Sequence, residues 1–363
     1  MKEIVQIVPY LPPSISGVGD YALLLAEELR RSHDIHTSFI VGAPAWEGPP
    51  EINGFSVTKI AGRTVSQLEG LLNEQAGDAL PVLLQYVGYG YEKRGCPAWL
   101  ARGLQAWRRA SAWRRLVTMF HELYAFGAPW RSSFWSSPLQ RWLVVKLAAI
   151  SDSCVTNMRR YARYLESRSP RRLQHINVLP VFSNVGEREA QDNQRRMEMV
   201  IFGGAGWREL AYTRCKKDLI GVCRRLNIIR LHDIGPPLAV RYRLPLEVTW
   251  HGLLPAAEIG EIMRASLAGF FTYPAPFLGK SGIFAAYAAH GLAPITFGGN
   301  NKHNEDRLRD DKHFLTGNAL ACDPATVSVV GKAARSWYSE HNLAAQALEF
   351  AALLTRPASA SHS

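Results

Sequence analysis

The chain has 363 residues, of which 47% are hydrophobic and 20% are charged, with 29 glycines and 21 prolines. At roughly 100–200 residues per domain this length favours two domains, and the composition excludes disordered, collagen-like and coiled-coil proteins. No apolar run reaches the roughly 18–20 residues that a membrane-spanning helix needs. The opening Met-Lys-Glu-Ile-Val also lacks the features of a signal peptide, so we expect a cytoplasmic protein.

The five cysteines are scattered, odd in number and without a Cys-x-x-Cys pair. This spacing fits neither a disulfide framework nor a zinc site, and we expect free, mostly buried thiols and no metal.

Positive charge and tryptophan are concentrated in one window of the chain. The net charge is +11, and eight cations stand against the single acid Glu122 between Trp99 and Lys146. Six of the ten tryptophans lie in the same window: Trp99, Trp107, Trp113, Trp130, Trp135 and Trp142. Such a stretch is typical of a membrane-interface surface or a nucleic-acid patch, unless the tryptophans pack inside the domain.

The chain opens with an apolar run from Ile4 to Val8, a small polar loop and the amphipathic segment Tyr21 to Leu29. A strand, a glycine-containing loop and a helix in this order indicate a doubly wound α/β domain. Further strands are expected at 37–41, 82–85, 116–120, 148–150 and 176–179, then at 199–202, 231–234, 246–250, 269–272 and 293–296.

The polar segment 183–196, which has no clear period, separates two similar series of strands and helices. We therefore predict two Rossmann-like domains facing across a cleft, spanning 1–180 and 181–340. A C-terminal helix from Leu343 to Leu354 and a frayed tail complete the chain over 341–363. Because open parallel sheets bind ligands beyond the carboxyl ends of their strands, the loops at those ends are the candidate sites.

Two candidate loops belong to the first domain. In the loop after the first strand, Gly17 and Gly19 would let the backbone approach a phosphate at a helix N-terminus; a tight turn without a ligand is the alternative. This loop lacks the Gly-x-Gly-x-x-Gly fingerprint of dinucleotide-binding proteins, which disfavours a dehydrogenase. His121 directly follows a predicted strand and could act on a sugar hydroxyl or phosphate, or serve only as a structural hydrogen-bonding group.

Two more loops belong to the second domain. Gly203 and Gly204 end a strand, and Arg208, Lys216 and Lys217 follow as candidate diphosphate ligands, with a solvated helix start as the alternative for the lysines. The run Gly279-Lys280-Ser281-Gly282 opens a helix of small residues. No glycine stands five residues before Gly279, which disfavours a P-loop NTPase.

The order of these motifs resembles a glycosyltransferase of the GT-B fold, group 1, family 4 type, over nearly the whole chain. Ser-x-x-Gly-Val-Gly-Asp-Tyr is similar to the glycine loop of that family, and Phe120-His121-Glu122 to its histidine motif. The run from Ser281 to Phe284, followed by Ala-His-Gly and Pro-Ile, is similar to its donor-binding stretch. The family's two glutamates would fall on Leu278 and Ala286, which are not acidic.

This resemblance implies retaining transfer of a sugar from a nucleotide-diphosphate donor, with a UDP-sugar favoured, and no cofactor or metal. It places His121 against the transferred sugar, and Leu253 and Tyr287 at the nucleoside. It places Asp20, Tyr86 and Glu122 towards the acceptor. The donor phosphates and sugar would meet Gly17, Gly19, Arg208, Lys216, Lys217, Gly279, Lys280, Ser281, Gly282 and Ile283.

The expected acceptor is a saccharide or a lipid-linked sugar used in polysaccharide or glycoconjugate synthesis. A lipid carrier would explain the basic, tryptophan-rich window as a peripheral contact with an anionic membrane, on the inner face of the plasma membrane. Two alternatives remain. The missing glutamates suggest an inactive GT-B-like nucleotide-sugar-binding protein. The positive charge suggests a nucleic-acid-binding protein, which the glycine loops and the absence of a nucleic-acid motif disfavour.

Overall fold

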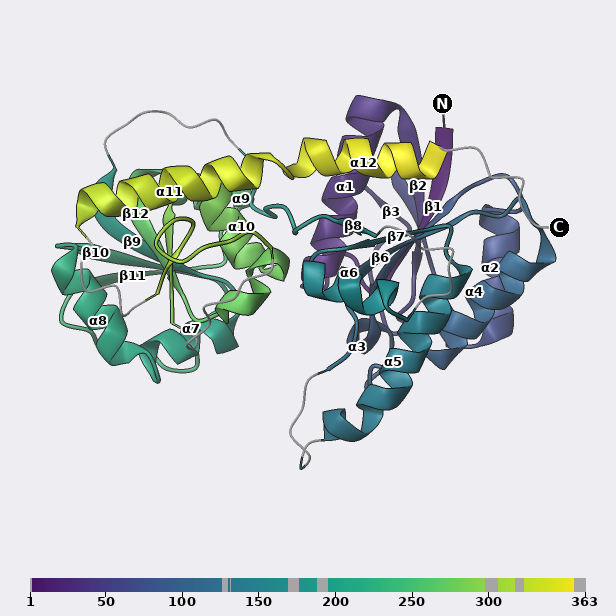
Figure 1. Cartoon of the computed structure of the whole chain (residues 1–363), viewed down its shortest axis with the longest axis horizontal. Coiled ribbons are helices and arrows are strands. Elements are labelled where there is room, and N and C mark those ends of the chain that lie inside the picture. Colours follow the sequence, from purple (N-terminus) through teal and green to yellow (C-terminus); the bar gives the residue numbers. More distant parts are fainter. Residues whose placement is uncertain are drawn as a thin grey trace. The chain divides into compact units, whose positions relative to one another are not determined.

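The computed structural model describes residues 2–125, 130, 132–168, 176–187, 195–297, 306–316 and 323–355 (Figure 1). Packing divides the chain into unit 1, formed by Met1–Leu179 and Ala344–Ser363, and unit 2, formed by Pro180–Leu343. The C-terminal helix, expected as a segment of its own, packs within unit 1.

Unit 1 is built on a sheet of eight strands in the order β3-β4-β2-β1-β5-β6-β7-β8, parallel except for the pair β3 and β4. Its strands are β1 (Lys2–Val8), β2 (Ile35–Val41), β3 (Glu51–Ile52), β4 (Phe55–Lys59), β5 (Val82–Val87), β6 (Leu116–Glu122), β7 (Ser153–Thr156) and β8 (Asn177–Val178). Its helices are α1 (Gly17–His33), α2 (Val65–Gln75), α3 (Gly88–Tyr91), α4 (Ala98–Ala110), α5 (Ser132–Ile150), α6 (Arg159–Glu166) and α12 (Leu343–Thr355).

Unit 2 is built on a parallel sheet of six strands in the order β11-β10-β9-β12-β13-β14. Its strands are β9 (Arg196–Phe202), β10 (Arg230–Ile234), β11 (Glu247–Gly252), β12 (Ser266–Phe271), β13 (Ala293–Thr296) and β14 (Leu315–Thr316). Its helices are α7 (Ala205–Tyr212), α8 (Lys216–Arg225), α9 (Ala256–Ala265), the 3-10 helix η1 (Ala275–Lys280), α10 (Gly282–Ala289) and α11 (Pro324–Ser339).

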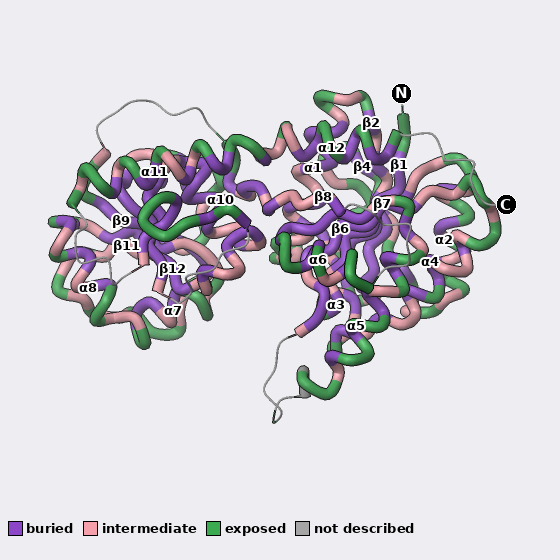
Figure 2. Tube along the Cα trace, viewed as in Figure 1, coloured by how far each residue is buried: buried purple, intermediate pink, exposed green. Residues whose placement is uncertain are grey.

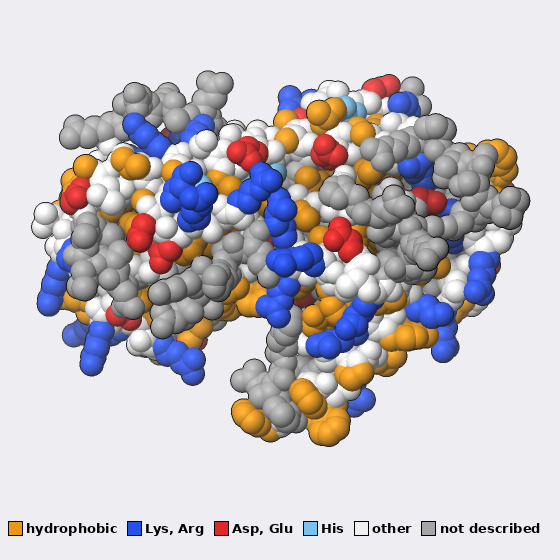
Figure 3. Space-filling view, in the orientation of Figure 1, with side chains coloured by type: hydrophobic (Ala, Val, Ile, Leu, Met, Phe, Trp, Pro, Cys, Tyr) orange, Lys and Arg blue, Asp and Glu red, His pale blue; other side chains and the backbone are white. Residues whose placement is uncertain are grey.

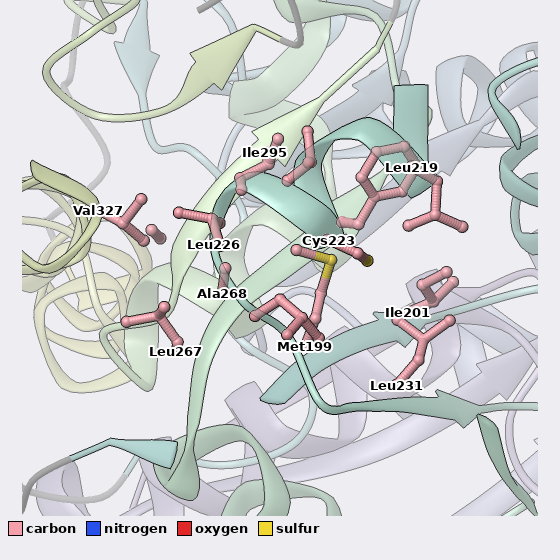
Figure 4. Packing of buried hydrophobic residues seen from close by; sticks show 14 of the residues in the cluster. Met199, Ile201, Leu219, Cys223, Leu226, Leu231, Leu267, Ala268, Ile295 and Val327 are labelled. Carbon is pink, nitrogen blue, oxygen red and sulfur yellow. The ribbon is translucent and has the colours of Figure 1, made fainter. Parts of the chain in front are cut away.

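Both cores lie along the strands, because a parallel sheet covered by helices buries both of its faces (Figure 2). In unit 2, Met199 and Ile201 of β9 pack with Leu219 and Cys223 of α8 (Figure 4). Cys154 and Cys223 are buried free thiols, while Cys96 and Cys215 are half-buried free thiols; Cys322 lies outside the described residues.

The strand predicted at 148–150 is wrong, because these residues form the last turn of α5. Leu143, Val144, Leu147 and Ala148 are buried at helical spacing on one face of α5, and the next strand begins only at Ser153. A short apolar run does not by itself distinguish a strand from the buried face of a helix.

Each sheet reverses its strand order once, between β1 and β5 in unit 1 and between β9 and β12 in unit 2. At such a switch point the connections on either side lead away from each other, which leaves room for a ligand at the carboxyl ends of the strands.

Candidate functional site

Two glycines shape the loops at the switch point of unit 2. Gly203 follows β9 with φ of +123°, and a Cβ there would lie 2.6 Å from Cδ1 of Ile283 in α10. Gly235 follows β10 with φ of +145°, and its Cβ would lie 2.2 Å from the carbonyl oxygen of Gly203. Residues with a side chain rarely adopt these backbone angles, so glycine lets the loops after β9 and β10 pack against each other and against α10.

The N-terminus of α10 lies at the same edge. The Ser281 hydroxyl accepts a hydrogen bond from the Phe284 N–H at 3.2 Å and so caps the helix. Gly282 is the first helical residue, and a Cβ on it would have no neighbour within 4 Å. The first N–H groups of a helix have no partner within the helix and carry partial positive charge, so this end of α10 is suited to bind an anion.

Other residues of the same stretch are held by the protein. The Gly279 carbonyl accepts a hydrogen bond from the Val181 N–H at 2.8 Å. The Lys280 ammonium lies 5.4 Å from the centre of the Phe277 ring. Leu278 and Ala286, where the family has glutamates, are both buried apolar residues.

The structure corrects the expectation that Arg208 faces a phosphate. Its guanidinium is buried, with 1% of the residue exposed, and forms an ion pair with Asp233 at the end of β10. The same guanidinium donates hydrogen bonds to the carbonyl oxygens of Gly203 and Pro236. Arg208 therefore holds the Gly203 loop in place instead of offering a free charge to a ligand.

The Asp233 carboxylate also accepts a hydrogen bond from the Tyr212 hydroxyl at 2.7 Å. Burial raises the pKa of Asp233, although Tyr212 and Arg208 both act in the opposite direction. Arg208 and Asp233 are thus a desolvated ion pair beneath the glycine loops.

Lys216 and Lys217 begin α8, and Lys217 is exposed. Along the chain, α7 and the turn 213–215 separate these two lysines from the Gly203 loop.

The expected nucleoside contact of Tyr287 is also corrected. Tyr287 is fully buried, and its hydroxyl accepts a hydrogen bond from the Phe202 N–H and lies 3.1 Å from the carbonyl oxygen of Val200. The ring fills the space beside Gly269 and cannot stack on a base. Leu253 is 65% exposed after β11, and its contact with the nucleoside stays a prediction.

At the switch point of unit 1, α1 begins at Gly17 after the Ser16 cap, whose hydroxyl accepts a hydrogen bond from the Gly19 N–H at 3.2 Å. A Cβ at Gly17 would meet nothing within 4 Å, so the backbone is open to a ligand there. A Cβ at Gly19 would lie 2.4 Å from the Tyr10 carbonyl oxygen. Gly19 is therefore explained by helix packing, and Asp20 of the first turn is half-buried.

His121 is held by a chain of buried glutamines. The Gln6 amide donates to the Ala22 carbonyl at 3.1 Å, and the Gln85 amide donates to Gln6 Oε1 at 2.7 Å. Gln85 Oε1 lies 2.7 Å from Nε2 of His121 and can only accept, so this nitrogen carries the proton and Nδ1 carries the lone pair. Burial lowers the pKa of His121 to about 3, so the ring is neutral at physiological pH.

The residues at the ends of β5, β6 and β7 form one polar group. The Tyr86 hydroxyl is buried with no hydrogen-bond partner among the described residues, and burial raises its pKa. Glu122, half-buried, raises the pKa of Tyr86 and of Tyr161 further through its charge. The Asn157 amide donates to the His121 carbonyl at 3.0 Å. Tyr86, His121 and Glu122 therefore occupy one edge, as neighbouring parallel strands require.

Sequence reasoning missed Gln6, Gln85 and Asn157. The available signal was a glutamine inside each of two apolar strand runs, Ile4 to Val8 and Val82 to Val87, because a polar residue is buried only when it has a partner.

The two edges offer different chemistry. Unit 2 has a helix N-terminus suited to an anion, and unit 1 has a polar group made of the buried Tyr86, neutral His121 and Asn157 with the half-buried Glu122. In the part of the chain that the structure describes, no group of three or more His, Cys, Asp or Glu could hold a metal ion.

No family model matches the sequence, and no curated protein sequence matches it. Solved structures share its fold. HepE of Anabaena, in complex with UDP-glucose, is 12% identical, with a TM-score of 0.60 over 96% of this chain and 99% of HepE. TarM is 7% identical, with a TM-score of 0.62 over 98% of this chain and 99% of TarM. The lipopolysaccharide outer core galactosyltransferase WaaB is 12% identical, with a TM-score of 0.51 over 97% of this chain and 99% of WaaB.

These similarities cover both units, and they confirm the α/β fold of two Rossmann-like domains expected from the sequence. The chain has the GT-B fold.

Proposed function

We propose that the chain is a glycosyltransferase that moves a sugar from a nucleotide-diphosphate donor, with UDP-sugars favoured, to a hydroxyl of a saccharide or lipid-linked acceptor. The observation that carries the proposal is the N-terminus of α10, packed against the Gly203 loop at the switch point of unit 2. A helix N-terminus approached by glycine loops stabilises the two charges of a departing diphosphate. The UDP-glucose of HepE, which has the same fold, supports a UDP-sugar.

The proposed reaction proceeds with retention and without a metal. The bond between the anomeric carbon and the β-phosphate oxygen breaks, and the acceptor hydroxyl attacks from the same face of the sugar. A phosphate oxygen of the leaving diphosphate accepts the hydroxyl proton, so no enzymatic nucleophile is needed. The dipole of α10 offsets the charge on the diphosphate, and Lys216 or Lys217 remains the candidate cation.

We place the sugar and acceptor beside His121. With its proton on Nε2 bound to Gln85, the ring can accept a hydrogen bond from a sugar hydroxyl through Nδ1. Tyr86 and Glu122 at the same edge would orient the acceptor. Polysaccharide or glycoconjugate synthesis at the inner face of the membrane is the context we propose.

The alternative is a nucleotide-sugar-binding protein without transferase activity. It is favoured by the buried apolar side chains of Leu278 and Ala286, where donor-contacting carboxylates were expected. No helix in the described part of the chain is long and apolar enough to cross a membrane, which both functions allow.

Release of nucleotide from UDP-glucose, UDP-galactose, UDP-N-acetylglucosamine, GDP-mannose and ADP-glucose tests the proposal. We expect turnover with at least one UDP-sugar, and an unchanged anomeric configuration in the product by proton NMR. Calorimetric binding of a donor without nucleotide release would support the inactive protein, and failure to bind any of the five would contradict both functions.

A further inference from the structure

Helix α5 and the residue Trp130 before it expose several large apolar side chains to solvent. The exposed fractions are 42% for Phe134, 75% for Trp135, 48% for Leu139 and 50% for Trp142, and Trp130, just before the helix, is 85% exposed. We call these five residues the α5 face. Single exposed apolar residues are ordinary on protein surfaces, but three tryptophans in thirteen residues are not.

The α5 face is the outer side of a helix that is already packed. Leu143, Val144, Leu147 and Ala148 bury the opposite side of α5 against β6 and α4. At about 100° per residue, positions 134, 135, 139 and 142 fall within one exposed arc. The outer side of a surface helix is normally polar, so this apolar arc is a candidate binding surface.

The topology places the beginning of this face near the candidate site. β6 ends at Glu122 with its carboxyl end beside His121, and α5 runs back to the start of β7 at Ser153. The N-terminal end of α5 therefore lies at the carboxyl edge of the sheet, the edge that carries Tyr86, His121 and Glu122.

The charge along α5 and the segment before it has one sign. No acidic residue occurs from Leu123 to Ser151, whereas Arg141 and Lys146 are exposed on α5. The Lys146 ammonium lies 5.3 Å from the centre of the Trp142 ring, and the Arg141 guanidinium lies 4.3 Å from that of Tyr124. Figure 3 shows hydrophobic side chains gathered over the projecting end of α5.

We propose that the α5 face docks onto an anionic lipid bilayer, with the helix lying in the interface and not crossing it. Tryptophan is favoured at the level of the lipid headgroups, and each cation near an anionic surface strengthens binding about fivefold. This inference deepens the proposed function. It rests on that function in one respect, the lipid-linked acceptor, which membrane docking would bring to the edge of the sheet that holds His121.

A second copy of the chain is a poorer occupant. A twofold interface through the α5 face would bring Arg141 and Lys146 of both copies together with no acid from Leu123 to Ser151 to neutralise them. Nucleic acid is also poorer, because Leu139 and Trp142 would have to leave water for a phosphate backbone that binds chiefly through charge.

Flotation of the full chain with vesicles tests the proposal. We expect binding to phosphatidylcholine vesicles that contain phosphatidylglycerol, and weaker binding to vesicles of phosphatidylcholine alone. High salt should weaken the binding to the anionic vesicles. The double variant Trp135→Ser, Trp142→Ser should bind about tenfold less or weaker still, because two large apolar side chains no longer enter the interface. Arg141→Gln, Lys146→Gln should lose most of the preference for the anionic lipid.

The matched control is Trp113→Ser. Trp113 is 70% exposed but precedes β6, at the opposite edge of the sheet, so its loss should leave vesicle binding unchanged. Nucleotide affinity and the thermal unfolding temperature should be the same in all four proteins.

Failure of the wild-type chain to bind anionic vesicles at low salt would overturn the docking surface, as would equal binding of the double variant. The proposal would also be overturned if the wild-type chain bound no vesicles but formed a dimer, and the double variant were monomeric. That result would assign the α5 face to a second copy of the chain. Vesicle binding needs no donor or turnover, so it stands or falls separately from the proposed transferase activity.

Discussion

Replacing Arg208 by alanine is expected to lower the free energy of unfolding by about 3–5 kcal/mol, the loss typical of removing one partner from a buried ion pair. The variant leaves the Asp233 carboxylate desolvated, with the Tyr212 hydroxyl as its one remaining side-chain partner among the described residues. It also removes the hydrogen bonds that fix the carbonyl oxygens of Gly203 and Pro236. The loop that approaches α10 should therefore loosen as unit 2 loses stability.

Urea unfolding monitored by tryptophan fluorescence measures this loss, because Trp250 packs against Tyr212, with 5.2 Å between their ring centres. Lys217→Ala is the control: it removes an exposed cation of the same crossover and should change stability by less than about 0.5 kcal/mol. Removing both charges in Arg208→Met, Asp233→Leu should recover much of the loss, since no unpaired buried charge remains. Equal stability of Arg208→Ala and the wild type would contradict the role of the ion pair.

Replacing His121 by alanine is expected to lower kcat about tenfold or more, while the affinity for UDP changes by less than about twofold. The ring contacts the transferred sugar in our account, and its hydrogen bond strengthens as charge develops at the anomeric carbon. UDP carries no such sugar, so its binding should not depend on the ring. Steady-state kinetics and UDP calorimetry separate the two quantities.

The pH profile gives an independent reading of the same residue. Because burial lowers the pKa of His121 to about 3, its ring stays neutral from pH 5 to 8 and should produce no step in kcat over that range. His36→Ala, at the amino-terminal end of β2, removes a histidine from the opposite edge of the sheet and should leave kcat unchanged. Equal losses in kcat and UDP affinity for His121→Ala would indicate a structural role.

Local patterns predicted the strand series because its members are short apolar runs bounded by loops. They could not predict the partner of Arg208, since Asp233 lies 25 residues further along the chain, and only the pairing of β9 with β10 brings the two together. A cation after a glycine turn fits a phosphate ligand and a buried ion pair equally well. Only the residues that the sheet brings next to the cation distinguish the phosphate ligand from the buried ion pair.

The tryptophan-rich window shows the same limit. Trp107 lies on α4 and is buried, whereas Trp113 lies beyond the end of that helix at Ala110 and is exposed, a difference that helical spacing does not explain. The exposed face of α5 could not be predicted from the window alone, because α5 is apolar on both sides. The side that packs on the sheet is fixed only by tertiary structure.

A titration of UDP into the wild type and two variants of Gly282 tests the central claim, that the donor diphosphate binds at the N-terminus of α10. A Cβ at Gly282 would meet nothing within 4 Å, and a carboxylate in the first turn stabilises a helix, so Gly282→Asp should fold normally. Its charge should repel the diphosphate and lower UDP affinity about 100-fold, while the isosteric Gly282→Asn should bind within a few-fold of the wild type. Wild-type protein that does not bind UDP, or an aspartate variant that binds it as tightly as the asparagine variant, would contradict the account.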